Sequence, residues 1–412
     1  MRILLLTQFY PPVLGGEERH VRTLAHELAA RGHDVSVATL SRDAVGVELD
    51  GGIRVHRMQG TASRIGALFA DEERRHVPPL PDPELVLALG RIVARERPEI
   101  VHAHNWLVHS FLPLKPWSHA RLVLTLHDYS LVCAKKSLVY RDAVCDGPGA
   151  RKCLQCAASH YGAAKGVATV VGTWTMGRFE RRAVDMFVPV SRAAAIGNRL
   201  DDLGLPYTVI PNFIPARDDA RDGVADDLLE RLPPRYFLFA GDVRRFKGID
   251  VLLRAHAGLR DAPALVLLGR LCADAPREYP DAVYATGPWP HGAVLAAWDR
   301  SLAGVAPSVG LEPMPTAVLE AMRSGRPVIG SRIGGIADAI VDGETGFLVP
   351  AGDADALREA MQRVADDAGL RDRMGRAAKA RVAAFEADAV VPRIESVYAQ
   401  LLSREAHGQP RA

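Results

Sequence analysis

The stretch GLEPMPTAVLEAMRSGRPVIG, from Gly310 to Gly330, combines a loop, a helix and a strand in one short run. Pro315 suits the first position of a helix, because its missing N–H would have no partner there anyway. Good helix formers with one apolar face follow over 316–324. Gly325 suits the position just after a helix, and the proline two residues later ends it. The segment PVIGS then reads as a short buried strand.

Two carboxylates flank the start of this predicted helix. Glu312 lies in the loop that enters the helix, and Glu320 lies about one turn inside it. Helix N-termini bind anions through unpaired N–H groups and the helix dipole. The spacing therefore favours a phosphate pocket in which the carboxylates bind hydroxyl groups, with two solvated glutamates as the alternative.

Outward from this stretch, strands alternate with helices along almost the whole chain. This alternation predicts an α/β fold in which each parallel sheet carries helices on both faces. The first half contains the strand candidates RILLLT, HDVSVATL, EIVHAH, RLVLTLH, DMFVPVS and YTVIPN; the second contains YFLFAGD, ALVLLG, AVYATG, LAGVAP, PVIGS and GFLV.

The pattern restarts after a charged segment that ends in two prolines, which indicates two Rossmann-like domains. We expect an N-terminal domain over 1–212 with a cysteine-bearing insertion at 133–156. We expect a C-terminal domain over 213–385 and a final helix over 386–412 that packs back on the N-terminal domain. Open α/β sheets bind ligands beyond the carboxyl ends of their strands, so the expected site is a cleft between the two domains.

Composition excludes several classes of function. The chain has 412 residues, 48% of them hydrophobic and 24% charged, with a net charge of +2, so no nucleic-acid partner is indicated. No apolar run approaches the roughly 18 residues that a membrane span needs. We expect a cytoplasmic protein.

The helical segment VATVVGTWTMGRFERRAVD favours a buried helix with a basic edge, and contact with a membrane surface is the alternative. Nothing in the sequence sets the oligomeric state.

The ordered set of motifs resembles the retaining glycosyltransferases of family 4, which have the GT-B fold. The matching segments are YPPVLGGEERHVRTLAHELAARGHDVSVAT, VHAH, TLHD, VPVS, VIPNFIP, GDVRRFKGIDVLLRAH, EPMPTAVLEAM and IGGIADAIVDGETGFLV. They span residues 1 to about 350 in the family's order.

The resemblance implies a nucleotide-sugar donor, with a UDP-sugar expected. Glu312 would contact the donor-sugar hydroxyls, Glu320 would bind the ribose hydroxyls, and Lys247 would neutralise the pyrophosphate. In the family, backbone amides of this loop contact the donor sugar and phosphate. Pro313 and Pro315 have no N–H, so the amides of Met314 and Thr316 would make these contacts here. The predicted donor-binding residues are Gly15, Gly16, Arg244, Arg245, Lys247, Glu312, Met314, Pro315, Thr316 and Glu320.

The histidine of TLHD, His127, would contact the donor sugar near its anomeric carbon, and it is predicted to be catalytic together with Lys247 and Glu312. The predicted acceptor-binding residues are Glu18, His104 and Asn105. His20, beside Glu18, reads as a packing residue. The alternative for a lone histidine such as His127 is a hydrogen-bonded core side chain.

One position departs from the family. Relatives often carry an arginine where this chain has Asp242, and a carboxylate there would repel phosphate. We expect Arg244 or Arg245 to supply the second cation; ordinary surface charge is the alternative for both.

The resemblance implies attack on the front face of the sugar with no covalent nucleophile, so catalysis would rest on positioning and phosphate stabilisation. No catalytic metal is expected. The acceptor stays open among glycans, lipid-linked intermediates and small-molecule aglycones. Two other functions compete: a GT-B sugar-nucleotide epimerase, and a non-catalytic sugar-nucleotide-binding module.

Four cysteines fall close together, at Cys133, Cys145, Cys153 and Cys156. Clustered cysteines in a cytosolic chain favour a metal over disulfides, which indicates a structural zinc site. The spacing is not that of a standard zinc finger, so free thiols or a disulfide remain the alternative.

Overall fold

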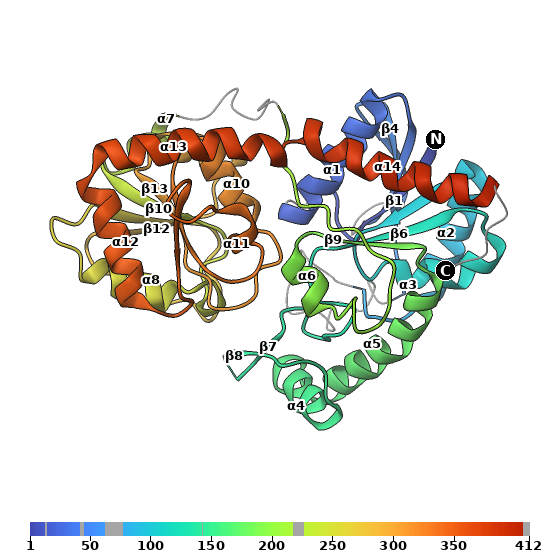
Figure 1. Cartoon of the computed structure of the whole chain (residues 1–412). Helices are drawn as coiled ribbons and strands as arrows, with labels where there is room; N and C mark the ends of the chain where they lie inside the picture. Colours follow the sequence, from blue (N-terminus) through green and yellow to red (C-terminus); the bar gives the residue numbers. More distant parts are fainter. Residues whose placement is uncertain (13–14, 42–44, 62–76, 142, 217–225, 407–412) are drawn as a thin grey trace. The chain divides into compact units, whose positions relative to one another are not determined.

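The computed structural model describes residues 1–12, 15–41, 45–61, 77–141, 143–216 and 226–406. The chain divides into two compact units. The first holds residues 1–140, 145–211 and 387–412, and the second holds 141–144 and 212–386. Each unit has a parallel sheet with helices packed against it (Figure 1), which confirms the predicted α/β class with two Rossmann-like halves.

In the described part of the first unit, seven strands form one sheet in the order β3-β4-β2-β1-β5-β6-β9. Neighbouring strands run parallel except β3, which is antiparallel to β4. The strands are β1 (Arg2–Leu6), β2 (Asp34–Leu40), β3 (Gly46–Asp50), β4 (Ile53–Met58), β5 (Ile100–Ala103), β6 (Arg121–Leu126) and β9 (Met186–Pro189).

The helices of the first unit pack on this sheet or on one another, and α4 packs on α5 (Figure 1). They are α1 (Gly16–Ala30), α2 (Pro83–Glu96), α3 (Val108–Phe111), α4 (Ala150–Tyr161), α5 (Ala163–Ala183), α6 (Arg192–Gly197) and α14 (Ala387–Ala406), with a 3₁₀ helix η3 at Leu112–Trp117. The insertion also carries the two short strands β7 (Val139–Tyr140) and β8 (Ala143–Val144).

The last helix, α14, returns from the second unit to pack on α1. His33 Nε2 lies 2.7 Å from a carboxylate oxygen of Glu395. The Tyr398 hydroxyl lies 2.6 Å from Nδ1 of the fully buried His102 on β5. The C-terminal helix therefore belongs to the core of the first unit.

One predicted strand is wrong. The segment YTVIPN makes only an isolated bridge between Phe187 and Tyr207, and it continues as extended chain rather than as a strand. Its apolar side chain Ile210 is nevertheless buried. The apolar residues of this segment predicted a strand, but Pro211 has no N–H to continue a hydrogen-bonded ladder.

In the described part of the second unit, six parallel strands follow the order β12-β11-β10-β13-β14-β15. The strands are β10 (Tyr236–Ala240), β11 (Ala264–Leu268), β12 (Val283–Gly287), β13 (Ala303–Ala306), β14 (Val328–Ser331) and β15 (Gly346–Val349). The helices are α7 (Asp226–Glu230), α8 (Ile249–Ala257), α9 (His291–Arg300), α10 (Thr316–Arg323), α11 (Ile336–Ala339), α12 (Ala354–Asp366) and α13 (Ala368–Val382), with 3₁₀ helices η5 (Arg245–Lys247) and η6 (Ala383–Phe385).

Each sheet has a place where the strand order reverses. In the first unit it lies between β1 and β5, and in the second between β10 and β13. Ligands of open α/β sheets bind beyond the carboxyl ends of the strands at such points. The residues that follow β5, β10 and β13 are therefore where each unit's site is expected.

The part of the chain that the structure describes has no helix long and apolar enough to cross a bilayer. The longest helix, α5, presents Phe179 and, to a lesser degree, Trp174 to solvent, while Met176 is buried. Arg178 lies on an exposed part of the same helix. Helix α5 is thus partly buried with a basic edge, and the alternative of membrane contact stays a prediction.

Candidate functional site

The segment between β13 and α10, residues 307–316, is called the donor loop here. Helix α10 runs from Thr316 to Arg323, as its sequence predicts, and ends in Gly325 with a φ of 65°. Pro315 is the residue that caps the helix rather than its first residue. The first amides of α10 have no partner within the helix, so they can donate to a ligand.

Glu312 is buried in the donor loop. One of its carboxylate oxygens lies 2.7 Å from Nζ of Lys247 and 3.5 Å from Oγ of Ser308. The Lys247 side chain is 26% exposed, and that of Glu312 only 8%. The lysine therefore neutralises a carboxylate that would be costly to bury alone, and its ammonium keeps access to solvent.

Two glycines let neighbouring backbone approach the loop. Gly334 has a φ of 60°, and a Cβ there would overlap the carbonyl oxygen of Glu312. Gly248 has a φ of 77°, and a Cβ there would overlap the carbonyl oxygen of Pro307. Gly335 N donates to the Glu312 carbonyl at 2.7 Å. These contacts fix the start and the middle of the donor loop, so a side chain at Gly248 would displace Pro307 and one at Gly334 would displace Glu312.

Glu320 on α10 is also buried, at 7% exposure. Its carboxylate oxygen Oε1 lies 3.0 Å from Nε2 of His291, the first residue of α9. Asn212 donates from Nδ2 to the Met314 carbonyl at 2.9 Å, which holds the loop just before the helix. The loop and the helix thus present two buried carboxylates, each oriented by a basic side chain.

The arginines near Lys247 are held by different carboxylates. Arg270 lies at the end of β11, and its guanidinium contacts Asp242 at 3.0 Å. Arg244 lies 3.8 Å from Asp274. The charge of Asp242 is therefore compensated locally, which sequence reasoning did not anticipate. Arg245, within η5, lies 3.4 Å from the Asp250 carboxylate.

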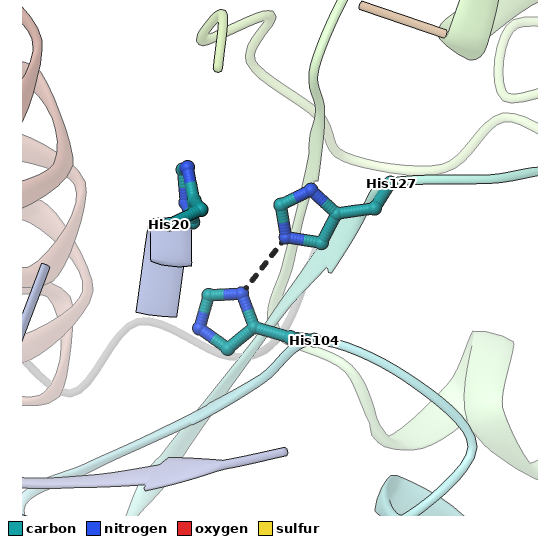
Figure 2. Close-up of side chains that lie close together, drawn as sticks. All are labelled: His20, His104 and His127. Carbon is teal, nitrogen blue, oxygen red and sulfur yellow. Dashed lines mark hydrogen bonds between the residues drawn. The ribbon is translucent and has the colours of Figure 1, made fainter. Parts of the chain in front are cut away.

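At the carboxyl edge of the first sheet, three imidazoles gather (Figure 2). His104 follows β5, His127 follows β6, and His20 comes from α1. His104 Nδ1 and His127 Nε2 are 3.0 Å apart. The ring of His20 is 4.8 Å from that of His127 and 5.7 Å from that of His104, centroid to centroid. We call these residues the histidine cluster.

Burial disfavours the charged form of two members of the histidine cluster, His20 and His104. His20 and His104 are 4% and 2% exposed, and burial, reinforced by the neighbouring imidazoles, holds the pKa of both well below the usual range for histidine. Behind them, burial lowers the pKa of His102 to about 3. Neutral imidazoles can donate or accept hydrogen bonds, which suits sugar hydroxyls better than phosphate.

The residue after His127 fixes its loop. The side chain of Asp128 accepts from Ser130 N at 2.8 Å, and its carbonyl accepts from Nδ2 of the buried Asn198 at 2.8 Å. Lys136 lies 3.8 Å from the same carboxylate. The TLHD motif thus combines one side chain aimed at the cluster with one that holds the turn.

The first turn of α1 contributes carboxylates beside the cluster. Gly15 caps α1 in extended conformation and Gly16 begins it, while Glu18 is buried. Glu17 accepts a hydrogen bond from Nδ2 of Asn105. Burial, with the neighbouring Glu18 carboxylate, raises the pKa of Glu17 to about 8. Sequence reasoning missed Glu17, because nothing local distinguishes it from its neighbour.

The cysteines remain free thiols. Cys153 Sγ accepts from Gly149 N at 3.3 Å, and Cys156 Sγ lies 3.7 Å from the Val139 carbonyl. Burial raises the pKa of Cys133 above the ordinary value for a thiol. Among the described residues, the grouping of three or more potential metal ligands is the histidine cluster and not the cysteines. The structural zinc stays a prediction.

Within each unit, the structure brings predicted residues together. Lys247 meets Glu312 in the second unit, and His104 meets His127 in the first. Sequence reasoning did not assign Ser308, His291 or Glu17 to the site, did not pair Arg270 with Asp242, and interpreted His20 only as a packing residue. The position of Ser308 directly beyond a strand was the available signal; the others pair across long stretches of sequence.

Comparison with known proteins places both units in one family. The family model described as Glycosyltransferase Family 4 matches residues 14–218, and the model described as Glycosyl transferases group 1 matches residues 224–381. Glycogen synthase of Mycobacterium tuberculosis is 28% identical over 447 aligned positions, which cover 100% of this chain and 97% of that protein.

Solved structures show the same fold. Sucrose-phosphate synthase from Thermosynechococcus elongatus superposes with a TM-score of 0.73 at 21% identity, covering 97% of this chain and 99% of that chain. HepE of Anabaena, solved in complex with UDP and glucose, superposes with a TM-score of 0.69 at 16% identity, covering 97% of this chain and 100% of that chain. The protein is a glycosyltransferase with the GT-B fold, and it belongs to glycosyltransferase family 4.

Proposed function

We propose that this glycosyltransferase transfers a sugar from a nucleotide-sugar donor to a hydroxyl acceptor, with retention of the anomeric configuration. The observation that carries the proposal is the buried ion pair between Lys247 and Glu312 at the switch point of the second sheet. The ammonium provides the charge for a leaving diphosphate. The carboxylate is placed for a sugar hydroxyl.

The donor's parts match the groups around the loop. Diphosphate would lie at the N-terminus of α10, where the dipole and the amides of Met314 and Thr316 favour negative charge. The ribose diol would bind Glu320, whose orientation His291 sets. A UDP-sugar is the proposed donor, in keeping with UDP and glucose in the structure of the Anabaena neighbour.

The first unit would supply the sugar side of the reaction. His127 would donate to a donor-sugar hydroxyl, and Glu18, His104 and Asn105 would face the acceptor. Retention without a protein nucleophile follows if the leaving phosphate takes the acceptor proton on the same face, so that Lys247 stabilises the charge that develops. The acceptor, a glycan, a lipid-linked intermediate or an aglycone, remains open, and we propose that the enzyme works in the cytoplasm.

A donor screen tests the proposal. Thermal unfolding with a panel of nucleotide sugars should show stabilisation by one donor, because a ligand that binds only the folded state raises its stability. Glu320→Ala should lose that shift, and Glu359→Ala, on the exposed face of α12, should keep it. A protein that no nucleotide sugar stabilises would contradict the proposal. Release of an altered sugar nucleotide without any acceptor would identify an epimerase instead.

A further inference from the structure

The histidine cluster holds a set of donor atoms that sugar binding does not explain. One nitrogen of each of His20, His104 and His127 lies within 4.8 Å of the other two. Among the residues that the structure describes, no other group of three or more histidine, cysteine or carboxylate side chains brings its potential ligand atoms this close together. Three converging imidazoles are the ligand set of a zinc site that keeps one coordination position open.

The spacing is close to what a small ion needs. Zinc binds imidazole nitrogen at about 2.0–2.1 Å, so tetrahedral geometry sets two such nitrogens about 3.3 Å apart. His104 Nδ1 and His127 Nε2 are already 3.0 Å apart. The nitrogen of His20 lies within 4.8 Å of the other two and would move inward on binding the ion. Figure 2 shows the three side chains arriving from separate elements around one space.

A second observation concerns the buried ring of His104. Its Nε2 is buried and has no hydrogen-bond partner among the described residues. His104 is 2% exposed, so water does not compensate freely. Buried polar atoms without partners are uncommon in folded proteins, and each indicates a missing ligand, water or ion. This nitrogen is not the one that faces His127, which is Nδ1, so an ion bound to Nδ1 would leave the ring's proton on Nε2.

The ring of His104 is held from behind by a second buried histidine. Behind the cluster, the ring of His102 lies 4.3 Å from that of His104, centroid to centroid, and is fixed by Tyr398 and Thr125. Two of the three side chains thus directly follow strands, β5 and β6, and the third lies on helix α1.

We propose that His20, His104 and His127 form a binding site for a borderline transition-metal ion such as Zn²⁺ or Co²⁺, with a fourth position open to water. Imidazole favours these ions over Mg²⁺ or Ca²⁺, which prefer oxygen. The part of the inference that concerns activity rests on the proposed function. His127 and His104 are also the residues proposed to contact the donor sugar and the acceptor, so an ion bound to them would compete with those contacts and lower the rate of transfer.

Cobalt titration tests the site without any enzyme assay. The full chain, without a histidine tag and stripped of metal by chelator, should bind one Co²⁺ and show the intense visible bands of four-coordinate cobalt. His20→Ala and His104→Ala should each weaken that binding more than about 100-fold, which exceeds the usual effect of losing an outer partner. The matched control is His26→Ala, on the same helix α1 but paired with Asp50, which should bind normally.

The competing site is the cysteine insertion, and the same titration separates the two. Thiolate ligands add strong near-ultraviolet charge-transfer bands to the cobalt spectrum, and imidazoles do not. A variant with Cys133, Cys145, Cys153 and Cys156 changed to serine should keep the visible bands. Visible bands that are lost in that variant, binding that survives His104→Ala, or no binding by the wild-type chain would each overturn the proposal.

Folding and activity are checked separately. Circular dichroism shows whether His104→Ala folds. If it does not, His20→Gln replaces it, and X-ray absorption of the wild-type cobalt complex counts the imidazole ligands directly. Fewer than three imidazoles would contradict the site. A wild-type chain that transfers sugar but binds no cobalt would reject this inference alone. Metal binding by a chain that transfers no sugar would reject only the proposed function and the inhibition that depends on it.

Discussion

The donor loop and the histidine cluster lie at equivalent places in their own sheets, beyond the strand ends where the strand order reverses. Their chemistry is opposite. The donor loop holds an ion pair, Lys247 with Glu312 at 2.7 Å, whereas in the cluster burial lowers the pKa of His20 and His104 and so favours their neutral form. One region is therefore suited to charge that develops on a phosphate, and the other to hydroxyl groups that stay neutral.

The largest expected effect is that of removing the lysine from the charged region. Lys247→Ala should lower kcat about 100- to 1000-fold, the range observed when one preorganised stabiliser of developing charge is removed. KM for the donor should change less, because the charge grows in the transition state. Steady-state kinetics with a donor identified by the thermal screen measures both values.

The control for this variant is Lys379→Ala, which removes an exposed lysine from α13 in the same unit. It should keep wild-type kinetics. A rise in KM with an unchanged kcat in Lys247→Ala would show that the lysine binds the ground state alone, and the assignment of Lys247 to the leaving group would fail.

The second expected effect is on donor affinity. Glu320→Ala should weaken donor binding by about 1–3 kcal/mol, because charge-assisted hydrogen bonds to two hydroxyls are lost and His291 loses its partner. Isothermal titration calorimetry gives the value directly. Unchanged affinity would mean that the ribose binds elsewhere, and Glu359→Ala again provides the matched control.

A smaller effect should identify the second phosphate cation. Arg244 lies 3.8 Å from its carboxylate partner, beyond hydrogen-bond distance, and its Nε is buried without a hydrogen-bond partner among the described residues. Arg244→Ala should therefore lower kcat about tenfold, the loss of one charged hydrogen bond. Arg245→Ala should be nearly silent, since its side chain is 70% exposed.

Arg270→Ala decides the alternative. If both Arg244→Ala and Arg245→Ala keep full activity while Arg270→Ala loses it, the pair that Arg270 forms with Asp242 supplies the cation. The arginine that relatives often carry at position 242 would then be replaced in function by Arg270. The expectation that Arg244 or Arg245 supplies the second cation would be wrong.

The smallest effect concerns the uncharged region and its neighbour Glu17. Its pKa of about 8 in the folded protein exceeds the ordinary value of 4.5. Between these values the folded chain keeps a proton that the unfolded chain has lost, so this carboxyl lowers stability as pH rises through that window. Glu17→Gln should unfold at a higher temperature than wild type at pH 9 and at a similar one at pH 4.

Thermal unfolding across that pH range measures the difference. Glu359→Gln, at an exposed position, should follow the wild-type curve at every pH. A Glu17→Gln curve that also parallels the wild type would show that Glu17 is ionised in the folded state at neutral pH, and the first turn of α1 would then be a charged region as well.

The sequence allowed much of the fold to be predicted, because hydrophobic periodicity is local. Helix α10 and its ends were readable from the formers over 316–324 and from Gly325. The weak spots were edges: β3 is largely exposed, and the buried segment around Ile210 is extended without forming a strand. Ile210 is buried by side-chain packing and not by strand pairing, and the hydrophobic pattern of the sequence does not distinguish the two.

The site was predictable only in part, for a related reason. Glu312 and Lys247 stand in recognisable motifs, and the structure places them together. The roles of His20 and Glu17 depend on burial and on residues about 85 positions away in the chain, namely His104 and Asn105. No local pattern reports such contacts, and no local pattern reports that Arg270 compensates Asp242.

The most direct test follows the anomeric carbon. The enzyme, with the donor chosen by the thermal screen and with methanol in place of the unknown acceptor, would be monitored by proton NMR as the first product forms. The account predicts a methyl glycoside with the donor's anomeric configuration, and it predicts that Lys247→Ala forms that product at least about 100-fold more slowly. A first product of inverted configuration, or an equal rate in that variant, would contradict it.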